Sequence, residues 1–436
     1  MKRKMLLILL AACLGLTACQ GQTLPAASVQ GSDATVPAPE STLPTQLPER
    51  TEAPATEPIT DSATEHAEVP EQPAQQLGFS DFDSKLIAYL RQSGLEDKNF
   101  TVSPLSFKAA LALTALGAEG ETQAQILQVL GFRDVEEMTR WYASVLAGTA
   151  MFESRIFGED KADCAYRVVN AIFHNLACDG EFRDSYKELV SSTMGALASS
   201  HSKEEITDAI NSWVSDQTNG LIPKLVQDAS KSAAVLVNAL YLKTKWAEAF
   251  NESNVTTFTT ADGTQVEKEF MEKTERFDYY EDENCQLVIL PLQGGVSMAL
   301  MLGECGDFPQ KLEAVQNRKV HVTMPKFEVE TSLENQELVD FLKAQGCETM
   351  FLDGCRDFDP MFTKGIHVDD IIQKAKVKVD EKGLEAAAAT AVIMVRNTAL
   401  PNPKEPVEFT ADHPFRFAIY RQDESPELLF WGQVNN

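Results

Sequence analysis

Residues 380–400 read DEKGLEAAAATAVIMVRNTAL. Alanine has the highest helix propensity, so the run of four alanines allows a buried helix. The surroundings favour an extended loop instead, because a predicted strand, residues 374–379, precedes the stretch and two more, residues 407–410 and 415–420, follow it. The first proline is Pro401, so every residue of the stretch keeps the backbone N–H that pairing in a sheet requires. The pattern therefore indicates a loop that is chemically suited to become a strand.

The alternation of side chains along this stretch is also compatible with insertion into a sheet. Successive side chains of a strand point to opposite faces. One face would carry Leu384, Ala386, Ala388, Thr390, Val392 and Met394. Glu385 falls on the other face, so its charge would not have to be buried.

The bulk composition is that of a globular protein with a strongly acidic surface. Of the 436 residues, 44% are hydrophobic and 24% are charged, and the formal net charge is −27. Binding of nucleic acids or of anionic lipid surfaces needs clustered Lys and Arg, so the composition argues against both. A solvated acidic face explains the charge most simply.

The beginning of the chain has the features of an export signal. Three basic residues precede an apolar run that ends at Leu16 and is too short to span a bilayer comfortably. The sequence LTAC that closes this run resembles the bacterial lipobox, in which the cysteine is lipidated. We therefore expect residues 1–19 to be a lipoprotein signal peptide and Cys19 to anchor the protein to the bacterial cell envelope. The domain would face the extracellular or periplasmic space.

Residues 20–77 have the composition of a disordered tether. They contain nine of the 20 prolines, no aromatic residue, and nine acidic residues against the single Arg50. Such a segment cannot bury enough apolar surface to offset the entropy lost on ordering.

Periodic hydrophobic patterns begin at Gly78. The expected helices are residues 82–90, 106–116, 121–130 and 207–218. The expected strands are residues 233–242, 285–290, 297–302, 320–329, 374–379, 407–410, 415–420 and 428–431. Helices come first and strands dominate later, which is typical of an α+β fold.

No catalytic or metal-binding constellation stands out. GVSMA, residues 295–299, comes near a nucleophile elbow, but Ser297 opens a predicted strand where that motif needs a helix to follow. No histidine lies at metal-ligand spacing from a cysteine. We therefore expect neither an enzyme nor a bound metal or cofactor. The cysteines of the body are Cys164, Cys178, Cys285, Cys305, Cys347 and Cys355, which permit free thiols or one or two disulfides of open connectivity.

Six motifs occur in order over the rest of the chain. They are NFTVSPLS (99–106), GAEGET (117–122), NSWV with TNGLIP (211–214, 218–223), LVNALYLK with KW (236–243, 245–246), MPKF (324–327), and HPF with LFWG (413–415, 429–432). Together with the alanine-rich stretch they resemble the serpin family over residues 78–436. The resemblance implies an α+β serpin fold with about nine helices around three β-sheets and an exposed reactive-centre loop.

The function that the resemblance implies is inhibition of serine proteases, with cysteine proteases as a second class. In serpins the protease cuts the loop and is held as an acyl-enzyme while the loop inserts into the central sheet. The alternative is a non-inhibitory serpin acting as a binding module. Leu384 is the best support for it, because inhibitory members usually carry a small hydroxyl residue there. We expect a monomer, and a surface hydrolase has no supporting constellation.

The resemblance also implies which residues form the moving hinge. They are Glu381, Gly383, Leu384, Glu385, Ala386, Ala387, Ala388, Ala389 and Thr390. Leu384 is apolar and can be buried, so we expect it to slow insertion rather than prevent it.

A second set of residues would hold the sheet closed until insertion. Ser103, Ser106 and Asn238 match the polar latch in the middle of the sheet, called the shutter, where Gln373 replaces the histidine of the family. Glutamine can still donate and accept hydrogen bonds. At the top of the sheet, called the breach, the closing groups would be Trp246 and an ion pair between Lys326 and Glu381.

The scissile bond can be placed by counting along the loop. Fifteen residues from the hinge glycine inclusive lead to the bond between Asn397 and Thr398. A loop one residue shorter would place it between Arg396 and Asn397 and favour trypsin-like proteases. Cleavage after Val395 or Met394 would suit elastase- or chymotrypsin-like enzymes, so the target class stays open.

Overall fold

The computed structural model describes residues 80–306, 308–334, 336–353, 355–368, 371–384, 405–422 and 427–436. All of them belong to one compact unit that begins at Glu71. The expected signal peptide and most of the loop that follows Leu384 lie outside the described residues. Within the described part, no helix is long and apolar enough to cross a membrane.

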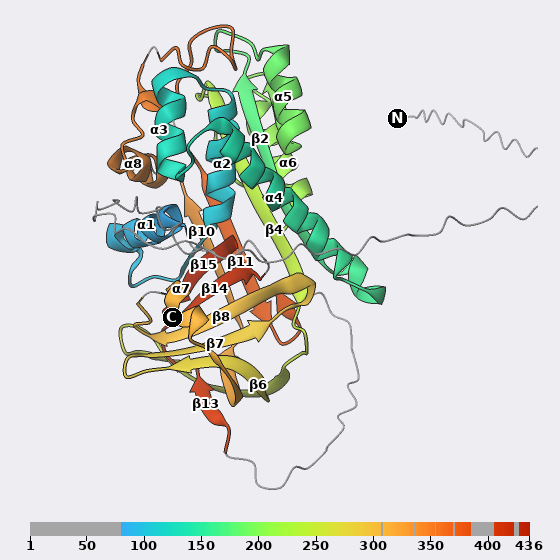
Figure 1. Ribbon diagram of the computed structural model, residues 1–436, viewed down its shortest axis with the longest axis vertical. Helices are drawn as coiled ribbons and strands as arrows, with labels where there is room; N and C mark the ends of the chain where they lie inside the picture. The colour runs from blue at the N-terminus through green and yellow to red at the C-terminus, as the bar shows by residue number, and fades with distance from the viewer. Residues whose placement is uncertain are drawn as a thin grey trace, which may run out of the picture. The chain divides into compact units, whose positions relative to one another are not determined.

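A six-stranded sheet forms one half of the architecture (Figure 1). In order across the sheet its strands are β10 (Phe327–Leu333), β11 (Gln373–Asp380), β12 (Gly383–Leu384), β4 (Ala234–Lys245), β2 (Ala165–Asn175) and β3 (Leu197–His201). All neighbours pair antiparallel except β2 and β3, which are parallel. The two-residue strand β12 therefore lies in the middle of the sheet, between β11 and β4.

A nine-stranded sheet forms the other half. Its strands are β1 (Phe100–Val102), β15 (Glu427–Val434), β14 (Phe415–Arg421), β8 (Val296–Gly303), β7 (Cys285–Pro291), β6 (Gln265–Glu281), β9 (Gln316–Pro325) and β13 (Val407–Thr410), with β5 (Asn251–Thr259) attached to β6. β6 is long enough to pair with β5 near its start, with β7 near its end, and with β9 over most of its length. Because β6 bridges these strands, the described residues form two hydrogen-bonded sheets where we had expected three.

Most of the helices gather around the six-stranded sheet, whereas α7 lies beside β14 and β8 of the nine-stranded sheet (Figure 1). Among the described residues the helices are α1 (Asp81–Leu90), α2 (Pro104–Leu116), α3 (Gly120–Leu130), α4 (Val135–Ser154), α5 (Asp184–Met194), α6 (Ile206–Gln217), α7 (Phe308–Glu313) and α8 (Glu337–Ala344). The four helices expected from the sequence correspond to α1, α2, α3 and α6. The expected α+β class is confirmed.

Helix α2 is the central helix of the main core. Ser103 caps it by accepting a hydrogen bond from the Ser106 amide, and Pro104 occupies the first turn, where no backbone donor is needed. Every residue except Leu116 is buried, because α2 packs against α3, α4, β4 and β15. Burial on all sides explains why its sequence is apolar all round rather than amphipathic.

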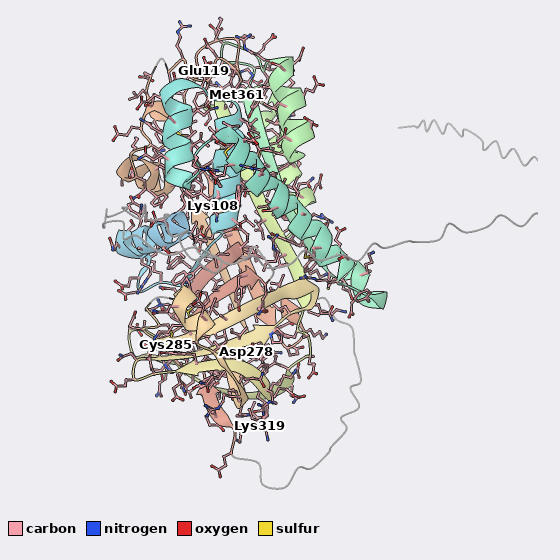
Figure 2. All side chains as sticks on the ribbon, in the orientation of Figure 1. Lys108, Glu119, Asp278, Cys285, Lys319 and Met361 are labelled. Atoms are coloured by element: carbon pink, nitrogen blue, oxygen red, sulfur yellow. A yellow bond between two sulfur atoms is a disulfide. The ribbon has the colours of Figure 1, made fainter. Side chains whose placement is uncertain are left out.

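One charged residue of α2, Lys108, is fully buried (Figure 2). Its Nζ lies 3.2 Å from Asp83 of α1 and 3.4 Å from Glu427 of β15. Trp141 of α4 donates from Nε1 to Glu427 at 2.7 Å. Burial raises the pKa of Asp83, and the two carboxylates raise the pKa of Lys108 against the opposing effect of its own burial. The cluster ties α1, α2, α4 and β15 together.

The strand expected over residues 320–329 is wrong as a single element. The structure divides it into β9 of the nine-stranded sheet and β10 of the six-stranded sheet. Pro325 cannot donate to a ladder, and the Lys326 amide instead bonds the Glu269 carbonyl at 2.8 Å, so the chain changes sheets at this point. Apolar and polar residues alternate on both sides of Pro325, so the pattern alone predicts a single strand.

One disulfide joins Cys285 at the start of β7 to Cys305 just beyond β8. Both residues are buried in the main core. Cys164, Cys178, Cys347 and Cys355 are free thiols.

Candidate functional site

The hinge begins with a tight reversal between β11 and β12. Asp380, the last residue of β11, accepts hydrogen bonds at its Oδ1 from the amides of Lys382 (2.8 Å) and Gly383 (3.2 Å). This side-chain turn sends the chain back into the sheet, so that Leu384 pairs with Val379. Burial raises the pKa of Asp380, although both amide hydrogen bonds favour its ionised form.

Gly383 is required where the chain enters the sheet. Its φ is 151°, a conformation that residues with a side chain rarely adopt. A Cβ atom built at this position would lie 2.2 Å from the Thr244 carbonyl oxygen and 2.6 Å from the Lys245 Cα. Only glycine therefore allows β12 to approach β4 this closely.

Leu384 points from β12 into the main core. It is 4% exposed and lines a small cavity with Leu242 of β4, Val377 of β11, Ile419 of β14 and Phe430 of β15. The even-numbered side chains of β4 and the odd-numbered ones of β11 also face this core. The apolar residue at this hinge position is thus buried already in the described conformation.

Beyond Leu384, β4 and β11 are not paired to each other. β12 bonds only residues 244 and 245 of β4 and residues 379 and 380 of β11. At the opposite end a single parallel bridge joins Leu236 to Ile371. In the described residues the two strands therefore flank a stretch without a ladder, which we call the slot.

The breach, at the hinge end of the slot, is closed by Trp246. Its indole Nε1 donates to the Asp380 carbonyl at 2.8 Å and its backbone amide donates to the Lys382 carbonyl at 3.0 Å. The ring is 2% exposed and meets Phe250 edge to face at 5.3 Å. Trp246 thus fixes both sides of the hinge turn.

Lys326 gathers three carboxylates next to the same turn. Its Nζ lies 2.9 Å from Glu381 and 3.4 Å from each of Glu252 and Glu269. The hydrogen bond to Glu381 raises the pKa of Lys326. Burial acts to raise the pKa of Glu381, but the hydrogen bonds and charge of Lys326 outweigh it and the pKa is lowered.

The shutter is built in two separate parts. Gln373 of β11 accepts a hydrogen bond from the Ser103 amide at 3.2 Å and donates one to the Ser103 carbonyl at 2.9 Å. Its side chain therefore binds the backbone of the residue that caps α2. Asn238 of β4 instead donates to Asn170 of β2. The structure brings Ser103, Ser106 and Gln373 together, whereas Asn238 hydrogen-bonds on the other side of the slot.

Asn238 belongs to a chain of hydrogen bonds that sequence reasoning missed. Asn170 donates to the Tyr142 hydroxyl at 2.7 Å, and Tyr142 donates to the Met194 carbonyl at 3.3 Å. Burial raises the pKa of Tyr142 to about 12. Asn238 Oδ1 is buried without a hydrogen-bond partner among the described residues, which leaves one acceptor unsatisfied at the edge of the slot. Nothing in the local sequence of Asn170 or Tyr142 marks this role.

On the outer face of the sheet two lysines flank the slot. Lys243 of β4 and Lys378 of β11 have the opposite parity to the core-facing residues of their strands. No carboxylate of the described residues forms an ion pair with either, although Lys374 and Lys376 of β11 are both paired with glutamates of β10.

The remaining sequence-predicted residues lie outside the described part of the chain. These are Cys19, Glu385, Ala386, Ala387, Ala388, Ala389, Thr390, Arg396, Asn397 and Thr398. Across the described ranges no group of three His, Cys, Asp or Glu side chains has the arrangement of a metal site. Ser297, the serine of the elbow-like sequence, lies in β8 and donates to Gln422 at 3.1 Å.

A six-stranded sheet in which the short strand β12 separates β4 from β11 can be compared with known proteins. A family model described as Serpin (serine protease inhibitor) matches residues 78–436. This chain is a serpin. Serpin B6 of Macaca fascicularis is 31% identical over 366 residues, covering 78% of this chain and 93% of that protein. Leukocyte elastase inhibitor A of Rattus norvegicus is 30% identical over 372 residues, covering 77% and 92%.

The solved structures agree on the fold. The crystal structure of Serpin48, described as a highly specific serpin of the insect Tenebrio molitor, has a TM-score of 0.66 and 26% identity, covering 81% of this chain and 96% of that one. The expected serpin fold is thereby confirmed. The homologues are serpins, which are inhibitors and not catalytic enzymes, though some are non-inhibitory.

Proposed function

We propose that this serpin inhibits serine proteases as a suicide substrate whose cut loop fills the slot. The observation that carries the proposal is the position of β12: its two residues already pair with both flanking strands where the loop begins. Continuation of the same pairing would add a strand antiparallel to both β4 and β11. Each residue added to the sheet would form backbone hydrogen bonds with the neighbouring strands. The side chains that face the core would also bury apolar surface.

The register of β12 against its two neighbours can be extended along the slot. Leu384 lies opposite Thr244 and Val379, so an antiparallel continuation sets Thr390 between Asn238 and Gln373. All three positions have the parity that faces the core. A threonine hydroxyl can donate to one group and accept from another. The Asn238 carbonyl oxygen, which has no partner in the described part of the molecule, would then gain a donor.

The chemistry needs nothing from the serpin beyond the peptide bond that it presents. The protease serine attacks the carbonyl of the scissile bond, the amine of the next residue leaves with a proton, and an ester joins protease and serpin. Insertion competes with hydrolysis of this ester by water. We propose the bond between Asn397 and Thr398, which lies fifteen residues from Gly383 when counted as in the family, with the bond between Arg396 and Asn397 as the alternative.

The test is incubation of the full chain with elastase, trypsin and subtilisin, followed by denaturing gels. We expect at least one complex that resists heat and SDS, and sequencing of the released fragment identifies the scissile bond. Thr390→Arg, which would force a charge into the core next to Asn238, should abolish the complex while the loop is still cut. Its matched control is Thr390→Ser, which keeps the hydroxyl at the same position, adds no charge, and should still form the complex.

A complementary measurement separates inhibition from simple cleavage. Cutting the loop with a protease that is then removed should raise the melting temperature by about 10 °C or more, because each inserted residue gains ladder bonds worth about 1 kcal/mol apiece. A cut chain that melts no higher, together with the absence of any covalent complex, would reject the mechanism and leave the binding-module alternative.

We also propose that the serpin is lipid-anchored through Cys19 on the outside of a bacterial cell. The support is the basic n-region, the apolar run and the LTAC sequence at residues 16–19. Expression in a bacterium that processes lipoproteins, with mass spectrometry of the mature N-terminus, should show an acylated cysteine. Cys19→Ala should release the protein from the membrane fraction, and an unmodified wild-type cysteine would refute the anchor.

A further inference from the structure

The end of β4 that receives the hinge lies beyond the ladder that joins β4 to β2. The pairing of β2 with β4 stops at Lys243. The next two residues of β4, Thr244 and Lys245, are the ones that pair with Leu384 and Gly383 of β12. In the described part of the chain neither of them has a ladder partner on the β2 side. The edge along which the loop would enter the sheet is therefore not held by a ladder from behind.

An ion-pair cluster takes the place of the missing ladder. Nζ of Lys245 lies 2.6 Å from Oδ1 of Asp160 and 3.0 Å from Oδ2 of Asp163. Asp160 belongs to the short helical turn Gly158–Ala162 that follows α4, and Asp163 comes directly after this turn. The hydrogen bond between Lys245 and Asp160 lowers the pKa of Asp160 and raises the pKa of Lys245, so both groups are charged at neutral pH.

A glutamine connects this cluster to the other residue that receives the hinge. Gln293 lies in the turn between β7 and β8 and donates from Nε2 to Oδ2 of Asp160 at 3.0 Å. Its backbone carbonyl accepts a hydrogen bond from the Thr244 hydroxyl at 3.1 Å. We call the set that holds this end of β4 from the side opposite β12 the clamp: Asp160, Asp163, Lys245 and Gln293.

The clamp is fixed to the C-terminal end of α4. Gly294, the neighbour of Gln293, packs so closely on the ring of Phe152 that an added Cβ atom would collide with it. Phe152 belongs to the last turn of α4 and is buried. Figure 1 shows that α4 ends at the same end of the six-stranded sheet as β4. The end of β4 is therefore held through side chains by a helix that takes no part in the ladder.

We propose that Lys245 is a positioning residue for loop insertion, an inference that rests on the suicide-substrate function. Through the clamp it keeps the end of β4 in the place where β12 pairs. It touches neither the scissile bond nor the protease and acts through the backbone of β4. A loop that meets an ordered edge does not have to order that edge as it pairs, so insertion competes better with hydrolysis of the acyl-enzyme.

Lys245→Met, which removes the charge and keeps most of the side-chain length, tests the assignment in the full chain. With a protease that the wild-type chain traps, the number of serpin molecules consumed per trapped protease should rise about fivefold, the effect of one partly exposed ion pair. The rate at which the intact loop is attacked should not change. The double variant Asp160→Asn, Asp163→Asn should reproduce this result, and Lys245→Arg, which keeps the charge, should behave like wild type.

Lys311→Met is the matched control for a loss of stability alone. The side chain of Lys311 is 20% exposed, close to the 25% of Lys245, and its partners Tyr280 and Asp282 lie at the end of β6 rather than beside β4. This variant should melt lower than wild type without consuming more serpin per trapped protease. If it raises the consumption as much as Lys245→Met does, the clamp acts only through general stability and the proposal is overturned.

Hydrogen exchange of the uncut chain gives a readout that needs no protease. The amides of residues 244–245 and 383–384 should exchange about fivefold faster in Lys245→Met, and at the wild-type rate in Lys245→Arg and Lys311→Met. Unchanged exchange in Lys245→Met would overturn the proposal, and so would an unchanged consumption of serpin, while the suicide-substrate function would stand. A wild-type chain that traps no protease would instead reject that function, and the exchange rates would still decide whether Lys245 holds the end of β4.

Discussion

At the scale of single residues, Gly383 shows how closely the hinge is fitted to the sheet. We expect Gly383→Ala to destabilise the domain by about 1–3 kcal/mol, because the added methyl group meets the Thr244 carbonyl in a backbone conformation already unfavourable for alanine. Hydrogen exchange at residues 244 and 245 should accelerate as β12 leaves the slot. Gly263, at φ 83° but with no atom within 4 Å of a built Cβ, separates backbone strain from collision. If Gly263→Ala has the same effect, the fit to β4 is not the cause.

The ion pair between Lys326 and Glu381 predicts a dependence on pH. Glu381 has a lowered pKa in the folded protein, so its contribution is present above the unfolded-state pKa of about 4.3 and is lost as the pH falls through the folded-state value. At pH 7, Glu381→Gln should cost about 1 kcal/mol in urea unfolding. The difference from wild type should shrink steadily below about pH 4.5. A difference that is constant down to pH 3.5 would mean that the carboxylate charge is irrelevant to the latch.

Part of this site could be foreseen from residues alone. The resemblance to the family implies Trp246, Lys326 and Glu381 at the breach. In the structure Trp246 donates to the carbonyl of Asp380 and Lys326 pairs with Glu381. Asn170 and Tyr142 could not be foreseen, because their role depends on β2 and α4 meeting beside β4, which no local pattern encodes.

At the scale of elements, long periodic segments were easier to predict than changes of sheet. Helices α1, α2, α3 and α6 follow from the spacing of apolar residues, and Gly220 indicates where α6 stops. The break between β9 and β10 was missed, because apolar and polar residues alternate on both sides of Pro325. The buried positions are nevertheless even-numbered before it and odd-numbered after it, and the two halves belong to different sheets. Strand β12 was equally hidden, since its pairing is decided by a gap between two distant strands rather than by its own two residues.

The two lysines that flank the slot predict a contribution to insertion itself. In the extended register Glu385 lies between Lys243 and Lys378 on the outer face. If the loop inserts, Lys243→Gln combined with Lys378→Gln should increase the number of serpin molecules consumed per trapped protease about two- to fivefold, the effect of about 0.5–1 kcal/mol. Lys319→Gln, an exposed change on β9, serves as the control. An unchanged stoichiometry would show that the lysines do not assist the hinge.

At the scale of the whole molecule, the disulfide between Cys285 and Cys305 ties together β7 and β8, two interior strands of the nine-stranded sheet. It closes a loop with a sequence separation of 20 residues, so its removal should cost about 3 kcal/mol. We expect the Cys285→Ser, Cys305→Ser double variant to fold and to melt lower than wild type. Reductant should lower the melting temperature of wild type alone. A variant that melts like wild type would show that the β7–β8 ladder needs no covalent support.

The slot between β4 and β11 has a further consequence for how such a molecule can be stored. It keeps two backbone edges inside a sheet uncommitted over several residues, and such edges accept any extended chain that reaches them. A neighbour's strand would satisfy them as well as the molecule's own. Warm, concentrated preparations should therefore lose activity by linking into chains, at a rate that rises with protein concentration, and dilution should preserve them.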